Sequence, residues 1–254
     1  MKTFIPNIDP YYQTLIVVWG NLILFTSYLI YDFSLTSIVI AIFGLFLFGA
    51  FSEISIHRYF THRTFQTDRF REHVLKVFAL LAGQGAILSW VTVHRYHHAF
   101  EDTEKDPHSP LYHPWWKIYL GLFPKDYRKN LITDLLKSKD KDYYIFENKY
   151  YCYMWIAIWV LSFLISMDLF YLIVSGAAMW YIATSTVNVF SHSLLLGEKS
   201  YEDSVATNSV ILNLLTGIGH HNNHHRQPEN YSYSHAGEID IYGWIIEKVF
   251  MKPT

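Results

Sequence analysis

Cysteine is almost absent from the sequence, and basic residues show no excess. Cys152 is the only cysteine among 254 residues, so a disulfide within the chain and a thiolate metal site are both excluded. Twenty lysines and arginines stand against 22 acidic residues, for a formal net charge of −2. No basic surface for nucleic acid is expected. The length suits a single domain covering residues 1–254, without internal repeats.

Charged residues are also missing from two long stretches. Residues 15–51 contain only Asp32, and residues 150–190 contain only Asp168. Each stretch is too long for one membrane span and suits two helices of roughly 16–18 residues. The breaks fall at residues 31–34 and 166–168. We expect an all-α membrane protein with four transmembrane helices in two hairpins, at about 15–51 and 150–190. Buried helical hairpins of a soluble protein are the alternative.

The positive charges predict how the chain is oriented. All lysines and arginines lie outside the two hairpin connections, so the positive-inside rule places the termini and the middle region in the cytoplasm. Residues of about 52–149 and 191–254 would form a cytosolic helical cap. We expect a multi-pass integral membrane protein whose functional site lies on the cytoplasmic face, in a bacterial inner membrane rather than the endoplasmic reticulum.

Several local expectations follow. Pro6 and Pro10 should keep residues 1–14 from forming a helix. Residues 74–93 should form a helix packed at the membrane interface or against the bundle, not a fifth span, because they include Lys76 and Gln84. The charged residues 125–149 should connect the two halves, and residues 238–250 should form a final amphipathic helix.

Fourteen histidines are present, and eight of them form three boxes. The boxes are His57-x4-His62, His94-x2-His97-His98 and His221-x2-His224-His225. A helix turns about 100° per residue, so histidines at i, i+3 and i+4 share a face and can point at one metal ion. His57 and His62 would lie about 140° apart. Their helix must therefore bend near His62, or the two rings must straddle the metal.

The number of histidines indicates more than one metal ion. Imidazole binds zinc, copper, iron or nickel, and a zinc site takes about four ligands. One box alone could be a surface or core cluster, but three boxes in one chain favour metal binding. Two metal ions suit this number of ligands best.

These motifs resemble those of the membrane-bound fatty acid desaturases, the group that contains the delta-9 acyl-CoA and acyl-lipid enzymes. The resemblance covers about residues 50–110 and 185–245. Besides the boxes, it is carried by Arg63-Thr64, Asp102-Thr103, Asp106-Pro107-His108 and Asn188-x3-His192. It implies four transmembrane helices, a cytosolic cap and a di-iron centre. The implied ligands are His57, His62, His94, His97, His98, His192, His221, His224 and His225, with Asn188 acting through a water.

The resemblance also implies an activity. It predicts that O2 and two electrons are consumed, that a cis double bond (delta-9 is expected) enters a saturated acyl chain, and that water is released. Such chemistry needs an oxidant that no side chain supplies. The acyl chain would be carried by a lipid or by coenzyme A. Paired arginines are missing after the second box, which weakens the case for coenzyme A. His113-Pro114 is followed by tryptophans, so we expect a separate electron donor, such as a ferredoxin or cytochrome b5, rather than a fused haem domain.

Some neighbours of the boxes are harder to interpret. Glu53, Asp102 and Asp106 could orient ligand histidines, or they could be ordinary capping or surface charges. His220 stands where many family members have an aromatic residue, and it could compete for metal or simply fill the aromatic position.

An acyl chain also needs a tunnel that fixes its register at the metals. Helical spacing places Phe43, Phe46 and Ala50 below His57, and Gly44 and Gly49 could let the acyl chain approach closely. These residues are the predicted wall of the tunnel. The alternative is that they only pack against other helices.

Two other functions fit parts of the pattern. A membrane di-iron hydroxylase of alkyl or lipid substrates would carry similar histidine boxes. A non-enzymatic metal transporter would place its ligands near the middle of the bilayer. The two apolar stretches are nearly free of such residues, which argues against a transporter.

Overall fold

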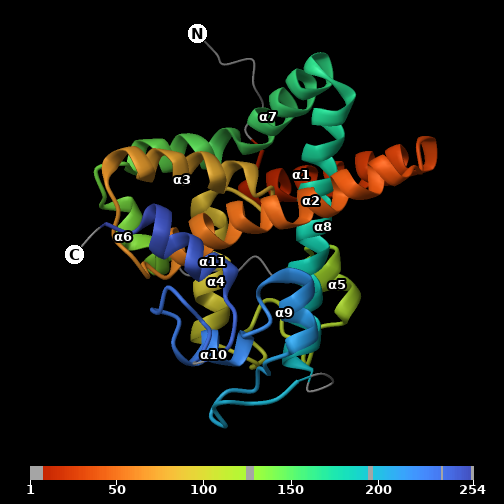
Figure 1. Ribbon diagram of the computed structural model, residues 1–254. Coiled ribbons are helices and arrows are strands. Elements are labelled where there is room, and N and C mark those ends of the chain that lie inside the picture. The colour runs from red at the N-terminus through yellow and green to blue at the C-terminus, as the bar shows by residue number, and fades with distance from the viewer. Residues whose placement is uncertain (1–7, 124–128, 194–196, 236, 253–254) are drawn as a thin grey trace.

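The computed structural model describes residues 8–123, 129–193, 197–235 and 237–252, and this part of the chain is helical, without strands (Figure 1). The long apolar helices are α1 (Pro10–Tyr31), α2 (Leu35–Phe51), α7 (Lys141–Ile165) and α8 (Met167–His192). The remaining elements are η1 (Ser52–Thr61), α3 (Arg69–Leu81), α4 (Ile87–Ala99), α5 (Trp115–Tyr119), η2 (Lys129–Ile132), α6 (Thr133–Leu136), α9 (Val210–Thr216), α10 (His221–Arg226), α11 (Ile241–Ile245) and η3 (Ile246–Phe250).

The two predicted breaks lie where the long helices end. α1 stops at Tyr31, and Ser34 begins α2 with a capping box to Ser37. Ser166 separates α7 from α8 and caps α8 through the amide of Leu169. The expectation of no helix before residue 15 was wrong, because α1 starts at Pro10. Proline is tolerated in the first turn of a helix, where its missing N–H has no helical partner.

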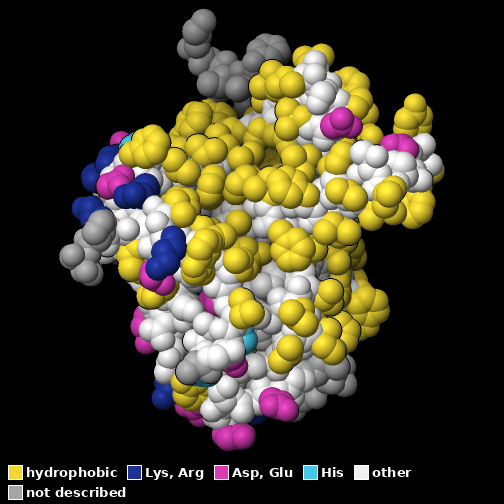
Figure 2. All heavy atoms as spheres, viewed as in Figure 1, with side chains coloured by type: hydrophobic (Ala, Val, Ile, Leu, Met, Phe, Trp, Pro, Cys, Tyr) yellow, Lys and Arg dark blue, Asp and Glu magenta, His cyan; other side chains and the backbone are white. Residues whose placement is uncertain are grey.

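Three helical stretches are long and apolar enough to cross a membrane, namely Pro10–Tyr31, Leu35–Thr61 and Met167–His192. α7 has 25 residues but begins with a charged and aromatic segment, and it does not belong to these three. The all-helical prediction is therefore confirmed, and three of the four predicted spans are supported. Figure 2 shows apolar side chains gathered over the long helices, with charged side chains mostly at the left, near α3, α6 and α11, and at the lower edge of the molecule.

The helix α8 is the centre of the packing. α1, α2 and α7 all contact it, and α1 packs on α7 and α8 rather than on its sequence neighbour α2. A Cβ added to Gly44 of α2 would lie 3.0 Å from the Cα of Gly176 in α8, so the two backbones meet at this point. Gly49 is covered by Tyr242 and Trp180. The space beside both glycines is therefore filled by protein atoms and not by an acyl chain.

Residues 74–93 do not form the single helix that we expected. They are divided between α3 and α4, and Gly83 and Gly85 lie in the connection with positive φ angles of 74° and 126°. An α-helix cannot continue through such a backbone, which glycine adopts readily. Residues 141–149, predicted to be part of a connector, extend α7 instead. The final amphipathic helix is the pair α11 and η3.

The first histidine box lies on a π-helix. η1 continues α2 without a break, and its hydrogen bonds join residues five apart, as in the 3.1 Å bond from the amide of His62 to the carbonyl of His57. The separation of about 140° expected for an α-helix therefore does not apply to His57 and His62. The wider turn brings residues at i and i+5 to one face, and such turns are frequent at functional sites.

Candidate metal centre

Ring nitrogens of nine histidines converge in the cap, beyond the ends of α2 and α8. They come from four segments, namely η1 with the residue after it, α4, the end of α8, and α10. They form two sets. The first histidine set comprises His57, His62, His94, His98 and His224, and the second comprises His97, His192, His221 and His225.

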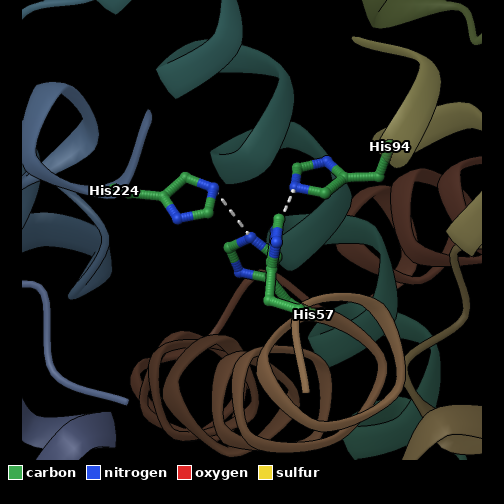
Figure 3. A group of neighbouring side chains, drawn as sticks. His57, His94 and His224 are labelled. Atoms are coloured by element: carbon green, nitrogen blue, oxygen red, sulfur yellow. Dashed lines mark hydrogen bonds between the residues drawn. The ribbon is translucent and has the colours of Figure 1, made fainter. Parts of the chain in front are cut away.

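Within the first histidine set, neighbouring Nε2 atoms are about a hydrogen-bond length apart. The Nε2 atoms of His57 and His224 are separated by 3.1 Å, as are those of His62 and His94. His98 completes the set, with its Nε2 atom 3.1 Å from that of His94 and 3.0 Å from that of His224. Figure 3 shows the rings of His57, His94 and His224 turned toward a common point.

The second histidine set is equally tight and more deeply buried. The Nε2 atom of His221 lies 2.9 Å from that of His192 and 3.2 Å from that of His225. The Nε2 atoms of His225 and His97 are 3.2 Å apart. His97 and His192 have no exposed surface, so bulk water does not reach their ring nitrogens.

Each H-x2-H-H box is divided between the two sets, so the expectation that its three histidines share one metal was wrong. His94 and His98 belong to the first set and His97 to the second. In α10, His224 belongs to the first set, whereas His221 and His225 belong to the second. The reason is geometric, because adjacent helical residues point about 100° apart and residues at i and i+4 nearly coincide.

The arrangement of these ring nitrogens suits a bound cation better than direct contact between the rings. The Nδ1 atom of His57 lies 2.7 Å from a carboxylate oxygen of Glu53, which places the ring proton on Nδ1. Its Nε2 atom is then a bare acceptor that faces His224. The Nε2 atom of His192 likewise faces His221, while its Nδ1 atom lies 2.7 Å from Asp102. Nε2 atoms brought together in this way can direct their lone pairs at one cation, so a metal ion would fit between them.

Burial keeps most of these rings neutral. Desolvation, followed by the neighbouring histidines, lowers the pKa values of His94, His97 and His98 well below the ordinary value. The same causes lower the pKa values of His221, His224 and His225. Neutral imidazole is the form that binds metal.

Four carboxylates lie behind the histidines. Glu53 and Asp102 contact His57 and His192 as described, and Asp106 lies 2.8 Å from the Nδ1 atom of His97. These three carboxylates therefore orient histidines and are not surface charges. Burial raises the pKa of Asp106 to about 7, and a nearby metal ion would oppose this shift. The fourth carboxylate, Glu101, lies 3.3 Å from the Nδ1 atom of His225. It was missed because it contacts a histidine of α10 and not the second box that it follows in the sequence.

The first histidine set is tied to the C-terminal segment by a buried cation. Arg58 has no exposed surface and forms two hydrogen bonds with Asp240, of 2.8 and 3.1 Å. Its guanidinium also covers the ring of Tyr233 at 4.1 Å, and this ring lies 4.4 Å from that of His224. Arg58 thus connects η1 with the segment that packs on α10.

Two cavities adjoin the histidines. The smaller, about 50 Å³, is lined by residues that include His57, His94, His221 and His224. The larger, about 370 Å³, extends from His94 and His108 between α1, α4 and α8 toward Asp9 and Asn148. Both are lined by Trp90, His94, Thr184 and Asn188, so they meet beside the first histidine set. Asn188 lies one turn before His192 in α8, as its spacing predicts.

The predicted tunnel wall does not line either cavity. Phe43 is 59% exposed and Phe46 is 41% exposed on the outer face of α2, and Ala50 lines neither cavity. The error comes from η1. A π-helix advances less per residue than the 100° that was assumed, so residues of α2 counted back from His57 fall on another face.

The remaining histidines lie outside the two sets. His73 and His235 are exposed. His113 bonds the carbonyl of Asp106 at 2.9 Å, and His220 bonds the carbonyl of Ile239 at 3.1 Å, so His220 does not compete for the site. His108 is buried against His97, with ring centroids 4.1 Å apart.

Comparison with known proteins agrees with this geometry. The fatty acid desaturase family model matches residues 34–240. The chain is 36% identical over 182 residues to "Delta-9 desaturase-like 2 protein" of Arabidopsis thaliana, covering 67% of this chain and 59% of that protein. It is 32% identical over 209 residues to "Acyl-CoA 5-desaturase AL21" of Anemone leveillei, covering 76% and 60%.

A cyanobacterial protein is matched over more of its length. The "sn-2 palmitoyl-lipid 9-desaturase" of Nostoc sp. (strain 36) is 28% identical over 228 residues, covering 85% of this chain and 76% of that protein. The chain spans about 60% of the length of the two plant relatives. Because the family model covers most of the chain, including residues 50–110, residues 185–240 and all nine histidines, the chain belongs to the fatty acid desaturase family.

Proposed function

We propose that this protein is an O2-dependent fatty acyl desaturase of lipid metabolism that uses two iron ions, one in each histidine set. The observation that carries this function is the convergence of nine imidazoles, most of them buried, in two tight groups beside a largely apolar cavity. Iron with imidazole ligands can activate O2 for attack on an unactivated C–H bond. The desaturases among the similar proteins support this chemistry.

In this proposal, the side chains of the protein bind the two iron ions and orient the histidine ligands. The first histidine set would hold one ion with five nitrogens. The second would hold the other with four, and Asn188 would reach it through a water. Glu53, Asp102 and Asp106 keep the Nε2 atoms of their histidines unprotonated and directed at the ions.

The larger cavity would hold the acyl chain. Its lining includes His94 and Asn188 beside the first histidine set and the apolar side chains of Leu15, Val18 and Leu88. Asp9, Tyr11 and Asn148 add polar groups that suit the end of the substrate that bears the carrier. An acyl chain in this cavity would displace water beside the metals and fix the position at which hydrogen is removed.

The same proposal includes the position of the double bond, the acyl carrier and the source of electrons. We place the double bond at delta-9, although one relative named above is a 5-desaturase. The carrier is an acyl-lipid or acyl-CoA. Electrons come from a separate protein such as a ferredoxin or cytochrome b5, because Cys152 alone cannot hold an iron–sulfur cluster.

The placement in the membrane follows from the charges. α7 serves as the fourth span, and the cap lies on the side with the lysines and arginines. In a bacterial inner membrane, the location that we propose, this side faces the cytoplasm.

Expression in a desaturase-deficient host, followed by mapping of double bonds in its lipids, tests the function. A cis alkene that depends on iron and O2 is the expected product. An alcohol at the same carbon would identify a hydroxylase instead. Lipids unchanged from those of the empty host would contradict both activities.

A further inference from the structure

Carboxylates are distributed unevenly around the two histidine sets. In the second set, three of the four histidines have an Nδ1 atom near a carboxylate oxygen. These pairs are His192 with Asp102 at 2.7 Å, His97 with Asp106 at 2.8 Å and His225 with Glu101 at 3.3 Å. In the first set, among the described residues, only His57 has such a partner, Glu53 at 2.7 Å.

Cations are distributed in the opposite way. The Nε atom of Arg58 lies 3.7 Å from Glu53, and both side chains are buried. Arg95 donates to the carbonyl of Thr61, directly before His62. In the part of the chain that the structure describes, no lysine or arginine lies within 4.0 Å of Glu101, Asp102 or Asp106.

The three carboxylates of the second set are also held rigidly as acceptors. Asp106 accepts hydrogen bonds from the amides of Asp102 and His108, at 2.9 and 3.1 Å. Asp102 accepts a hydrogen bond from the hydroxyl of Ser109, and Glu101 accepts one of 2.8 Å from Ser204. Such hydrogen bonds favour the charged form of a carboxylate.

The two metal ions would therefore experience different electrostatic fields. A carboxylate that accepts a proton from Nδ1 makes the opposite nitrogen a stronger donor to the metal. Buried negative charge also stabilises a higher positive charge on a nearby ion, and a cation beside that negative charge weakens this effect. The second histidine set has three carboxylates close to its Nδ1 atoms. The first set has one, Glu53, whose charge Arg58 also offsets, and Arg58 and Arg95 are further paired with Asp240 and Asp134.

Building on the di-iron centre proposed above, we infer that the two iron sites are inequivalent and that the second histidine set retains the ferric ion. When one electron is added to a diferric pair, the ion in the first set becomes ferrous and the ion in the second set stays ferric. Asp102 and Asp106 are the positioning residues that determine this order, because they contact the Nδ1 atoms of His192 and His97 and do not touch substrate. Glu101 adds a negative charge 3.3 Å from His225 without a hydrogen bond to it.

Mössbauer spectroscopy of the full-length protein loaded with ⁵⁷Fe and reduced by one electron tests this order. We expect one ferric and one ferrous component of equal area. In Asp106→Asn, the parameters of the ferric component should shift while the ferrous component stays within its linewidth. In Glu53→Gln, the ferrous component should shift instead. If Asp106→Asn fails to fold, Asp102→Asn takes its place, and the ferric component should again be the one that shifts.

Glu104→Gln is the matched control, because Glu104 is an exposed acid in the same loop and should leave both components unchanged. Iron content of about two per chain in each variant shows that the sites remain intact. A ferrous component that shifts in Asp106→Asn, or equivalent ions in the wild type, overturns the inference and leaves the desaturase function standing. A wild-type protein that binds no iron overturns both.

Discussion

The carboxylate of Glu147 in α7 accepts a hydrogen bond of 3.1 Å from the amide of Ile87, the first residue of α4. α4 has no cap from its own N-terminal residue Ala86, so a side chain from another helix fills this role. The hydroxyl of Tyr151 accepts a second bond, of 3.0 Å, from the amide of Gly85. α7 thereby fixes the start of the helix that carries the second histidine box.

Glu147→Ala should therefore loosen α4. The amide of Ile87 would be left buried without an acceptor, at a cost of about 1–3 kcal/mol. Thermal unfolding in detergent should show a lower Tm, and iron content should fall with it. Glu147→Gln keeps an acceptor oxygen, so its Tm and iron content should fall less than those of Glu147→Ala. Equal Tm values for Glu147→Ala and the wild type would mean that the bond does not stabilise α4.

Single histidine substitutions should separate the two metal sites. His62→Ala should weaken iron binding in the first set, and His192→Ala in the second, so that each variant retains about one iron per chain and loses activity. His73→Ala and His235→Ala are matched controls, because both histidines are exposed and lie outside the sets. Iron content by atomic emission measures the outcome. Two irons and full activity in His192→Ala would remove that residue from the ligands.

A bulky residue in the larger cavity should change the preferred chain length. Leu15 lines this cavity and is only partly buried, so Leu15→Trp can be accommodated while narrowing the space. The products should shift toward shorter acyl chains, with iron content unchanged. Phe46→Ala is the control, because Phe46 is exposed and lines neither cavity. The test is product analysis with fatty acids of graded length. A shift in chain length caused by Phe46→Ala but not by Leu15→Trp would mean that the acyl chain lies against α2, as the sequence predicted.

Reporter fusions should define the orientation of the chain. Reporters at residue 1, near Lys139 and at residue 254 should all be cytoplasmic, because four spans return the chain to its starting side. An extracytoplasmic signal at residue 139, between α2 and α7, would contradict the proposed topology. A signal at residue 254 opposite to that at residue 1 would show that α7 does not cross the membrane.

The sequence allowed the helix breaks and the histidines to be predicted, because both depend on local signals. Asp32 interrupts an apolar stretch, and Ser34 and Ser166 cap the helices that follow. The carboxylates close to the boxes, such as Glu53, could also be identified as possible partners because they are near their histidines in sequence.

Features that depend on backbone winding or on distant contacts could not be predicted. No residue type signals the π-helix, which displaced the predicted tunnel wall from His57. The division of each box between two sets depends on where α8 and α10 meet α4, and this is a tertiary property. The partner of Glu147 lies 60 positions away in the sequence, with no pattern that links the two.

Each histidine set includes residues of α10, which follows α8 in the chain. During synthesis, α1, α2 and α8 would enter the membrane before either set is complete. Loading of the proposed iron ions would then take place on protein that is already inserted. A chain truncated before residue 221 should therefore reach the membrane but never acquire metal, and cellular iron must be delivered from the side on which the cap is exposed.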